Sequence, residues 1–174
     1  RRTLQILSTG LAMADIKDIM DDVKSDDVYY EEKEKESSIK PGTYEATIVD
    51  LTRKLNVKTK AGHICDIYWP RYKISSDSPK FSNRLIRDSG QFRYRSEEVR
   101  KRNLYYKKYL DKAEISLTKS EVDGNIRYSL PSISKDMILG KHVLINVYVE
   151  EWNDSRGYHK EPVAKLVKVI ENND

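Results

Sequence analysis

The most regular pattern in this chain is an alternation of apolar residues near its C-terminal end. Val143, Ile145 and Val147 recur at every second position of segment 141–150, which is the period of a β-strand with one buried face. A polar turn and a second apolar segment at 162–170 follow. The pair predicts a β-hairpin, and it constrains the chain to a fold built around an antiparallel sheet.

Weaker patterns of the same kind occur upstream. They predict strands at 43–51, 63–74, 84–88 and 91–95, and a hairpin at 121–128 around the Asp123–Gly124 turn. Helix formers at 97–112 predict one mid-domain helix, and Ser134 and Gly140 are suited to begin and end one further helical turn. We expect a mainly β fold, namely a small β-barrel of five or six strands of the oligonucleotide-binding (OB) type.

Charge divides the chain into two parts. Residues 15–36 contain ten acids and four lysines, a net charge of −6, whereas residues 37–174 contain 26 basic and 18 acidic side chains, a net charge of +8. The sequence predicts an acidic N-terminal extension at 1–38, with a short amphipathic helix at 14–24 and a disordered linker, and an OB-like domain at 39–174. The extension is either a solubilising leader or an arm that mimics nucleic acid or docks on a protein partner.

Basic and aromatic residues are concentrated in segment 80–108. It holds ten Lys or Arg side chains against three acids, and five aromatic side chains lie among them. Cations bind a phosphate backbone and release its counterions, while flat rings stack on unpaired bases. The combination favours a surface for single-stranded nucleic acid. Either ingredient alone has a simpler explanation, since basic segments are often solvated and tyrosines often fill a core.

The order of these segments is similar to a known family. The pattern Gly-x-Tyr-x-Ala-x-Ile-x-Asp covers residues 42–50, and Leu139, Gly140 and Lys141 lead into the long strand of the final hairpin. Over about residues 40–170 the layout resembles the single-stranded DNA-binding proteins of phage replication modules, which have an OB fold. The resemblance implies a protein that coats exposed strands, DNA in the first instance, without catalysing a reaction.

In an OB barrel the second and third strands and the adjoining loops carry the ligand. Alternation places Tyr68 and Trp69 on opposite sides of a strand, and we expect Trp69 at the edge of the core and Tyr68 exposed. Phe92 and Tyr94 share a face: outward rings stack bases, whereas inward rings leave only the arginines to meet phosphate. The candidate nucleic-acid-binding residues are Arg53, Lys54, Lys58, Lys60, Tyr68, Arg71, Tyr72, Arg87, Phe92, Arg93, Tyr94, Arg95, Lys101, Trp152, Arg156 and Tyr158.

Motifs for catalysis or metal binding are lacking in the sequence. It has no phosphate-binding loop, and its histidines and single cysteine, Cys65, do not have the spacing of metal ligands. We therefore expect no catalytic residue, no cofactor and no metal. One cysteine allows no intramolecular disulfide, which favours a reducing compartment, and no apolar run approaches the roughly 20 residues of a membrane span.

These observations together predict a cytoplasmic protein, in the host cell if the chain is viral, with no membrane partner. A homo-oligomer and a protein partner for the acidic arm are both compatible with the sequence. The alternative function is a structural or assembly adaptor, such as a virion or complex subunit, that uses the β-barrel for contacts between proteins.

Overall fold

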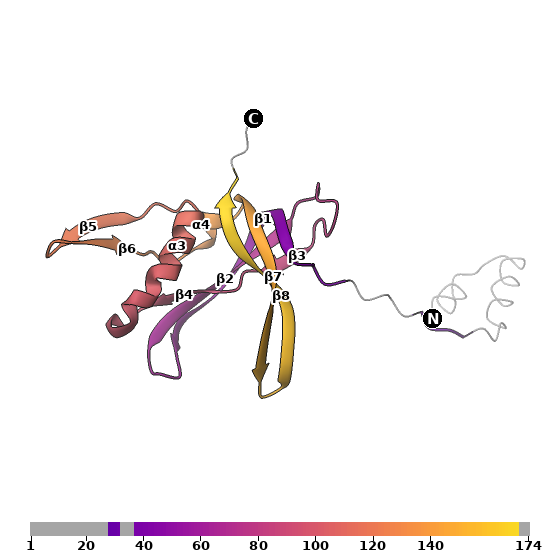
Figure 1. The fold of residues 1–174 in the computed structure, drawn as a ribbon, viewed down its shortest axis with the longest axis horizontal. Helices are drawn as coiled ribbons and strands as arrows, with labels where there is room; N and C mark the ends of the chain where they lie inside the picture. Colours follow the sequence, from indigo (N-terminus) through magenta and orange to yellow (C-terminus); the bar gives the residue numbers. More distant parts are fainter. Residues whose placement is uncertain (1–27, 32–36, 171–174) are drawn as a thin grey trace, which may run out of the picture. The chain divides into compact units, whose positions relative to one another are not determined.

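The computed structural model describes residues 28–31 and 37–170. The chain divides into two units, Arg1–Glu36 and Ser37–Asp174. The predicted helix at 14–24 lies outside the described residues. The helices and strands that the structure describes all belong to the second unit (Figure 1).

Six strands of this unit form one antiparallel sheet. They are β1 (Gly42–Lys58), β2 (Ile64–Ile74), β3 (Leu85–Arg87), β4 (Gln91–Tyr94), β7 (His142–Asp154) and β8 (Gly157–Val169). The strand order is β3-β2-β1-β7-β8, and β4 pairs with the first half of β2 while β3 pairs with its second half. The prediction of a mainly β fold is confirmed, although β1 extends well beyond the predicted 43–51.

Strand pairing does not close this sheet into a barrel. One isolated parallel bridge, between Asp88 and Ala164, joins the β3 end of the sheet to β8. At this point the Ser89 amide donates to the Ala164 carbonyl at 3.0 Å. Two irregularities interrupt the β1–β2 pairing, one of them between Ile48 and Asp50, whereas β1 pairs with β7 along its first six residues, from Gly42 to Thr47. The predicted closed barrel is therefore not confirmed.

The predicted helix at 97–112 consists of two parts. It begins as the 3₁₀ helix η1 (Glu97–Asn103), in which Val99 has non-helical dihedral angles, and continues as α3 (Leu104–Lys112). Asn103 lies at the junction, where its side chain accepts from the Tyr94 amide at 2.7 Å and donates to the Tyr94 carbonyl at 3.0 Å. These two bonds tie the start of α3 to the end of β4.

The core lies between the inner face of the sheet and α3. Val143, Ile145 and Val147 are buried, as the alternation in β7 predicts. Tyr106 and Leu110 of α3 are also fully buried against it. The inner face thus consists of aliphatic residues from β1, β7 and β8 together with tyrosines from β2 and α3.

Two small elements complete the unit. The strands β5 (Thr118–Val122) and β6 (Asn125–Ser129) form a separate hairpin around the predicted Asp123–Gly124 turn. The short helix α4 (Lys135–Ile138) follows, and Gly140 ends it with a φ of +87°, in the left-handed region that glycine tolerates best.

Candidate nucleic-acid interface

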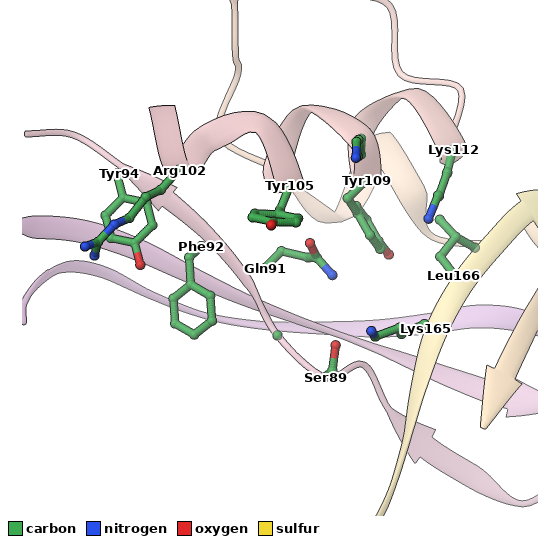
Figure 2. Close-up of a pocket in the computed structure, with 12 residues that line it drawn as sticks. Ser89, Gln91, Phe92, Tyr94, Arg102, Tyr105, Tyr109, Lys112, Lys165 and Leu166 are labelled. Atoms are coloured by element: carbon green, nitrogen blue, oxygen red, sulfur yellow. The ribbon is translucent and has the colours of Figure 1, made fainter. Parts of the chain in front are cut away.

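A cavity of about 570 Å³ opens between β4, α3 and β8 (Figure 2). Its lining consists of Ser89, Gly90, Gln91, Phe92, Tyr94, Arg102, Tyr105, Lys108, Tyr109, Lys112, Lys165 and Leu166. Four of these side chains are cations and four are aromatic, and none is acidic. Within residues 37–170 none of the four cations forms an ion pair. This combination suits a polyanionic ligand that also presents flat rings.

Strand β4 supplies two of the aromatic rings. Phe92 and Tyr94 lie opposite Ile67 and Cys65 of β2, so they point to the sheet face that is turned away from the core. Phe92 is 42% exposed, and the two rings stack with centroids 6.4 Å apart and planes inclined by 28°. Of the two arrangements that the sequence leaves open, the outward one is present.

Helix α3 supplies the most exposed ring of the cavity. Tyr105 is 72% exposed, whereas the neighbouring Tyr106 and Tyr109 are buried. Cations lie over two of the rings: the Arg102 guanidinium is 5.6 Å from the centroid of Tyr94 and the Lys108 ammonium is 5.7 Å from that of Tyr105. Tyr94 and Tyr105 therefore each lie within 6 Å of a cation that can bind phosphate.

A second cavity, of about 440 Å³, adjoins the first. It is lined by Thr52, Lys54, Trp69, Arg71, Arg87, Ser89 and Glu150. Ser89 lines both cavities, so the two cavities meet at this residue. The Lys54 ammonium lies 5.9 Å from the centroid of the Trp69 ring, which repeats the pairing of ring and cation seen beside α3.

Gly90 occupies the junction of the two cavities. Its φ is +111°, and a Cβ placed there would lie 3.1 Å from the Trp69 indole nitrogen. Both the backbone conformation and the close approach of the ring require a residue without a side chain. The glycine therefore allows the indole nitrogen to approach the chain closely where the two cavities meet.

A buried carboxylate lies directly beneath this junction. Asp88 is fully buried and accepts hydrogen bonds from the Tyr72 hydroxyl at 2.7 Å, the Gly90 amide at 2.8 Å and the Gln91 side chain at 2.9 Å. The Tyr72 hydroxyl also bonds to that of Tyr109 at 2.8 Å. Burial raises the pKa of Asp88 to about 6, although the three donors act in the opposite direction.

Two of the predicted stacking or binding residues on β2 are buried instead. Tyr68 is fully buried, and its hydroxyl bonds to Ser132 at 2.5 Å. Tyr72 is fully buried in the network around Asp88. The prediction that Tyr68 is exposed is therefore wrong, because Tyr68 points to the inner face of the sheet. Trp69, expected at the edge of the core, is half-buried and points to the opposite face, where it lines the second cavity.

Two predicted phosphate-binding arginines are already neutralised by carboxylates. Arg93 donates to Asp66, which is 1% exposed, at 2.8 Å and to the Leu130 carbonyl at 2.9 Å. Arg87 forms an ion pair with Glu161. Both guanidinium groups therefore tie elements of the fold together, and the prediction that they bind phosphate does not fit these contacts.

The remaining basic candidates lie at different distances from the two cavities. Lys54 and Arg71 line the second cavity. The other basic candidates, Arg53, Lys58, Lys60, Arg95 and Lys101, are exposed and line neither cavity. Arg95 donates to the Asn56 side chain at 2.6 Å, and Arg53 to the Ile133 carbonyl at 3.4 Å.

The candidates in the β7–β8 hairpin form a separate group. Trp152 stacks on His159 with centroids 5.2 Å apart. Tyr158 is 60% exposed, and a hydrogen bond to Glu151 raises its pKa. Arg156 is exposed at the turn. None of the three candidates lines either cavity, although this hairpin and the β1–β2 hairpin extend in the same direction (Figure 1).

Ten of the twelve residues that line the first cavity are absent from the candidates chosen from the sequence, and among them are its four cations and its most exposed ring, namely Arg102, Lys108, Lys112, Lys165 and Tyr105. The helical spacing contained a usable signal for three of them. Tyr109 and Leu110 follow Tyr106 by three and four residues, which marks the buried side of α3. Tyr105, Lys108 and Lys112 are separated by three and then four residues, so they share another side of the helix, which is exposed. For Lys165 we find no local signal.

The sequence matches no known protein-family model, and no curated protein is similar enough to count as a relative. In the described part of the chain, no helix has the length and apolarity to cross a membrane. Among the same residues, no three His, Cys, Asp or Glu side chains gather into a group that could hold a metal ion. The function is therefore argued from the geometry of the outer face.

Proposed function

We propose that this chain is a non-catalytic single-stranded DNA-binding protein of the phage replication or recombination type. The observation that carries the proposal is the 570 Å³ cavity, in which exposed aromatic rings and four cations gather without an acidic side chain. Phosphates would be bound by Lys108, Lys112 and Lys165, and bases would stack on Phe92 and Tyr105. Such a protein would act in the cytoplasm, that of the host cell if the chain is viral.

The arrangement of strands supports this proposal. An OB fold has five strands, with a helix before the last two, and binds oligonucleotides on the outer face of its second and third strands. Here β1 and β2 are followed by β3 and β4 on one edge, then by α3, and finally by the β7–β8 hairpin. The parallel Asp88–Ala164 bridge lies where the third and fifth strands of such a fold would meet. We infer an OB-like fold whose third strand is interrupted at residues 88–90.

Nucleic-acid binding would replace contacts between cations and rings with stacking of bases on the same rings. In the free protein, cations cover the faces of Tyr94 and Tyr105, and an exposed pair of this kind is worth about 0.5–1 kcal/mol. Stacking of a base is worth roughly 1–3 kcal/mol. A base can therefore displace the cation from the ring, and the released Arg102 or Lys108 side chain is then long enough to reach the adjoining phosphate.

A second candidate function is an adaptor that binds another protein. The observation that favours it is the exposure of Val28, Tyr29 and Tyr30, at 94%, 79% and 85%, within the acidic arm. Exposed aromatic residues among acids are suited to docking on a basic partner surface. Removal of residues 1–36 separates the two functions, because an adaptor would lose its partner whereas a DNA-binding protein would keep its affinity for DNA.

The test is fluorescence anisotropy with a labelled single-stranded oligonucleotide at two salt concentrations. The variants Phe92→Ala and Tyr105→Ala should each lose about 5- to 150-fold in affinity, which corresponds to one stacking interaction. Tyr128→Ala is the matched control, since Tyr128 is an exposed ring outside both cavities. Negligible binding by the unmodified chain at both salt concentrations would refute the proposal, as would equal losses for all three variants.

A further inference from the structure

The β5–β6 hairpin lies outside the main sheet and contributes nothing to the core. Each of its ten strand residues except Val122 is exposed, and Val122 is half-buried. Among the described strands, β5 and β6 pair only with each other. An isolated two-stranded hairpin is marginally stable in water, and its unpaired edges are templates for another strand. The hairpin is therefore a candidate for an interaction surface.

The two edges of the hairpin are not equivalent. Strand β6 supplies Asn125, Ile126, Arg127 and Tyr128 to a groove of about 630 Å³ that it shares with η1 and α3. From β5, only Val122 lines that groove. The β5 edge is thus the more open one, and any added strand would pair with β5.

The turn fixes which backbone groups of β5 point outward. Asp123 and Gly124 have φ values of +50° and +80°, as in a type I′ turn, and Val122 pairs with Asn125 across it. The residues that flank such a two-residue loop form a hydrogen-bonded pair, so Val122 directs its amide and carbonyl toward β6. Alternation along the strand then directs those of Lys119 and Glu121 toward the open edge.

The sequence of β5 complements itself in one register only. When two β5 strands meet antiparallel about a two-fold axis at Ser120, Lys119 of each copy lies opposite Glu121 of the other. A shift of the axis by one residue instead places Lys119 opposite Lys119, or Glu121 opposite Glu121. Opposite charges directly across an antiparallel pair stabilise it and like charges destabilise it, so the charge pattern selects the symmetric register.

We propose that β5 is a dimerisation edge, which pairs with β5 of a second copy about a two-fold axis at Ser120 to form a four-stranded β6-β5-β5-β6 sheet. In this interface, Lys119 of each copy forms a hydrogen-bonded pair with Glu121 of the other copy. The axis makes the interface isologous, so it closes at two copies and does not propagate into a fibre. The inference goes beyond the proposed function and does not depend on it.

Charge exchange tests the register by sedimentation velocity over a concentration series. The variants Lys119→Glu and Glu121→Lys each place like charges opposite each other twice, and should each weaken dimerisation roughly tenfold. The double variant Lys119→Glu/Glu121→Lys restores complementarity and should dimerise as the unmodified chain does. A mixture of the two single variants should form heterodimers, since the two glutamates of one copy then lie opposite the two lysines of the other.

Disulfide trapping detects the same contact when the dimer is weak. At a two-fold axis the two copies of Ser120 form a non-hydrogen-bonded pair, with Cα atoms about 4.5 Å apart, a separation that a disulfide can bridge. The variant Ser120→Cys should cross-link rapidly, and Ser129→Cys, an exposed position on β6, is its control. The native Cys65 is buried and does not compete.

Three results would overturn the proposal. The unmodified chain could sediment as a monomer at every concentration while Ser120→Cys cross-links no faster than Ser129→Cys. The single charge variants could dimerise as well as the double variant. The mixed single variants could fail to associate more strongly than either one alone. Loss of DNA binding, by contrast, would leave the dimer edge unaffected, because that measurement tests the other surface.

Discussion

The two faces of the β2–β4 sheet carry similar residue types but use them differently. On the inner face, Tyr68, Tyr72 and Arg93 are bonded to Ser132, Asp88 and Asp66. On the outer face, the rings of Trp69 and Phe92 border cavities and lie within reach of cations. In β2 and β4, a tyrosine or arginine is therefore structural or available to a ligand according to its parity along the strand, and residue type alone does not distinguish the two.

The inner face also explains why the outer one has a fixed shape. The Asp88 carboxylate holds Gly90 and Gln91 by hydrogen bonds, and these residues form the junction between the two cavities. The Asp66–Arg93 pair links β2 to β4, and the Asn56 amide of β1 donates to the same carboxylate at 2.8 Å. Polar groups that are satisfied inside the fold thus position the rings and cations that face outward.

We expect the largest effect from a substitution that removes an ion pair of the inner face. Arg93→Ala leaves Asp66, which is 1% exposed, without its cation, and loss of one partner of a buried pair costs about 3 kcal/mol or more. Arg95→Ala, two residues along the same strand face and exposed, should change the free energy of unfolding by no more than about 0.5 kcal/mol.

Urea unfolding of both variants measures this difference. A stability loss for Arg95→Ala as large as that for Arg93→Ala would contradict the structural role of the ion pair. A loss of DNA affinity in Arg93→Ala at temperatures where the protein stays folded would show that the two faces are not separate.

The pH dependence of the free energy of unfolding tests the same face, because Asp88 changes its protonation there. Burial raises the pKa of this carboxyl from 3.8 to about 6, so the folded state keeps a proton that the unfolded state releases between these values. Its contribution to stability is fully present below pH 3.8 and is lost as the pH rises through about 6, on the order of 3 kcal/mol in total. Asp88→Asn cannot titrate, and its stability should lack this decline.

The measurement is the free energy of unfolding in urea at several pH values from 4 to 7, for the unmodified chain and for Asp88→Asn. The Asp88→Asn substitution also removes an acceptor oxygen for Gly90 and Gln91. The stability lost in this way is the same at every pH. The difference in slope is therefore the result that counts, and parallel profiles would show that Asp88 is not protonated in the folded state.

Local signals in the sequence were sufficient for most of the fold. The alternation around Val143 predicts β7, and the Asp123–Gly124 pair predicts the hairpin turn, because both depend on neighbouring residues only. The single bridge between Asp88 and Ala164 depends on positions 76 residues apart, and no local pattern encodes whether strand pairing continues there to close a barrel.

The site was harder to predict because alternation gives two faces without saying which one is inner. Arg71 and Lys73 share the parity of Trp69, whereas Ile74 shares that of Tyr68. The charges of Arg71 and Lys73 therefore indicated that Trp69 faces outward, and this signal outweighs the general tendency of tryptophan to be buried. In α3, the buried positions follow an equally local pattern, and Tyr105 could have been assigned from it.

The smallest expected effect concerns single cations of the first cavity. Lys108→Gln or Lys165→Gln removes one charge from the cavity, and each phosphate contact to a single strand contributes about 0.7 to the slope of log affinity against log salt. Each variant should therefore lower that slope by about 0.7. Lys101→Gln is the control, because Lys101 is exposed but lines neither cavity. An equal decrease for Lys101→Gln would mean that DNA follows the general charge of segment 80–108 and not the cavity, and the distinction between the two faces would then matter for folding alone.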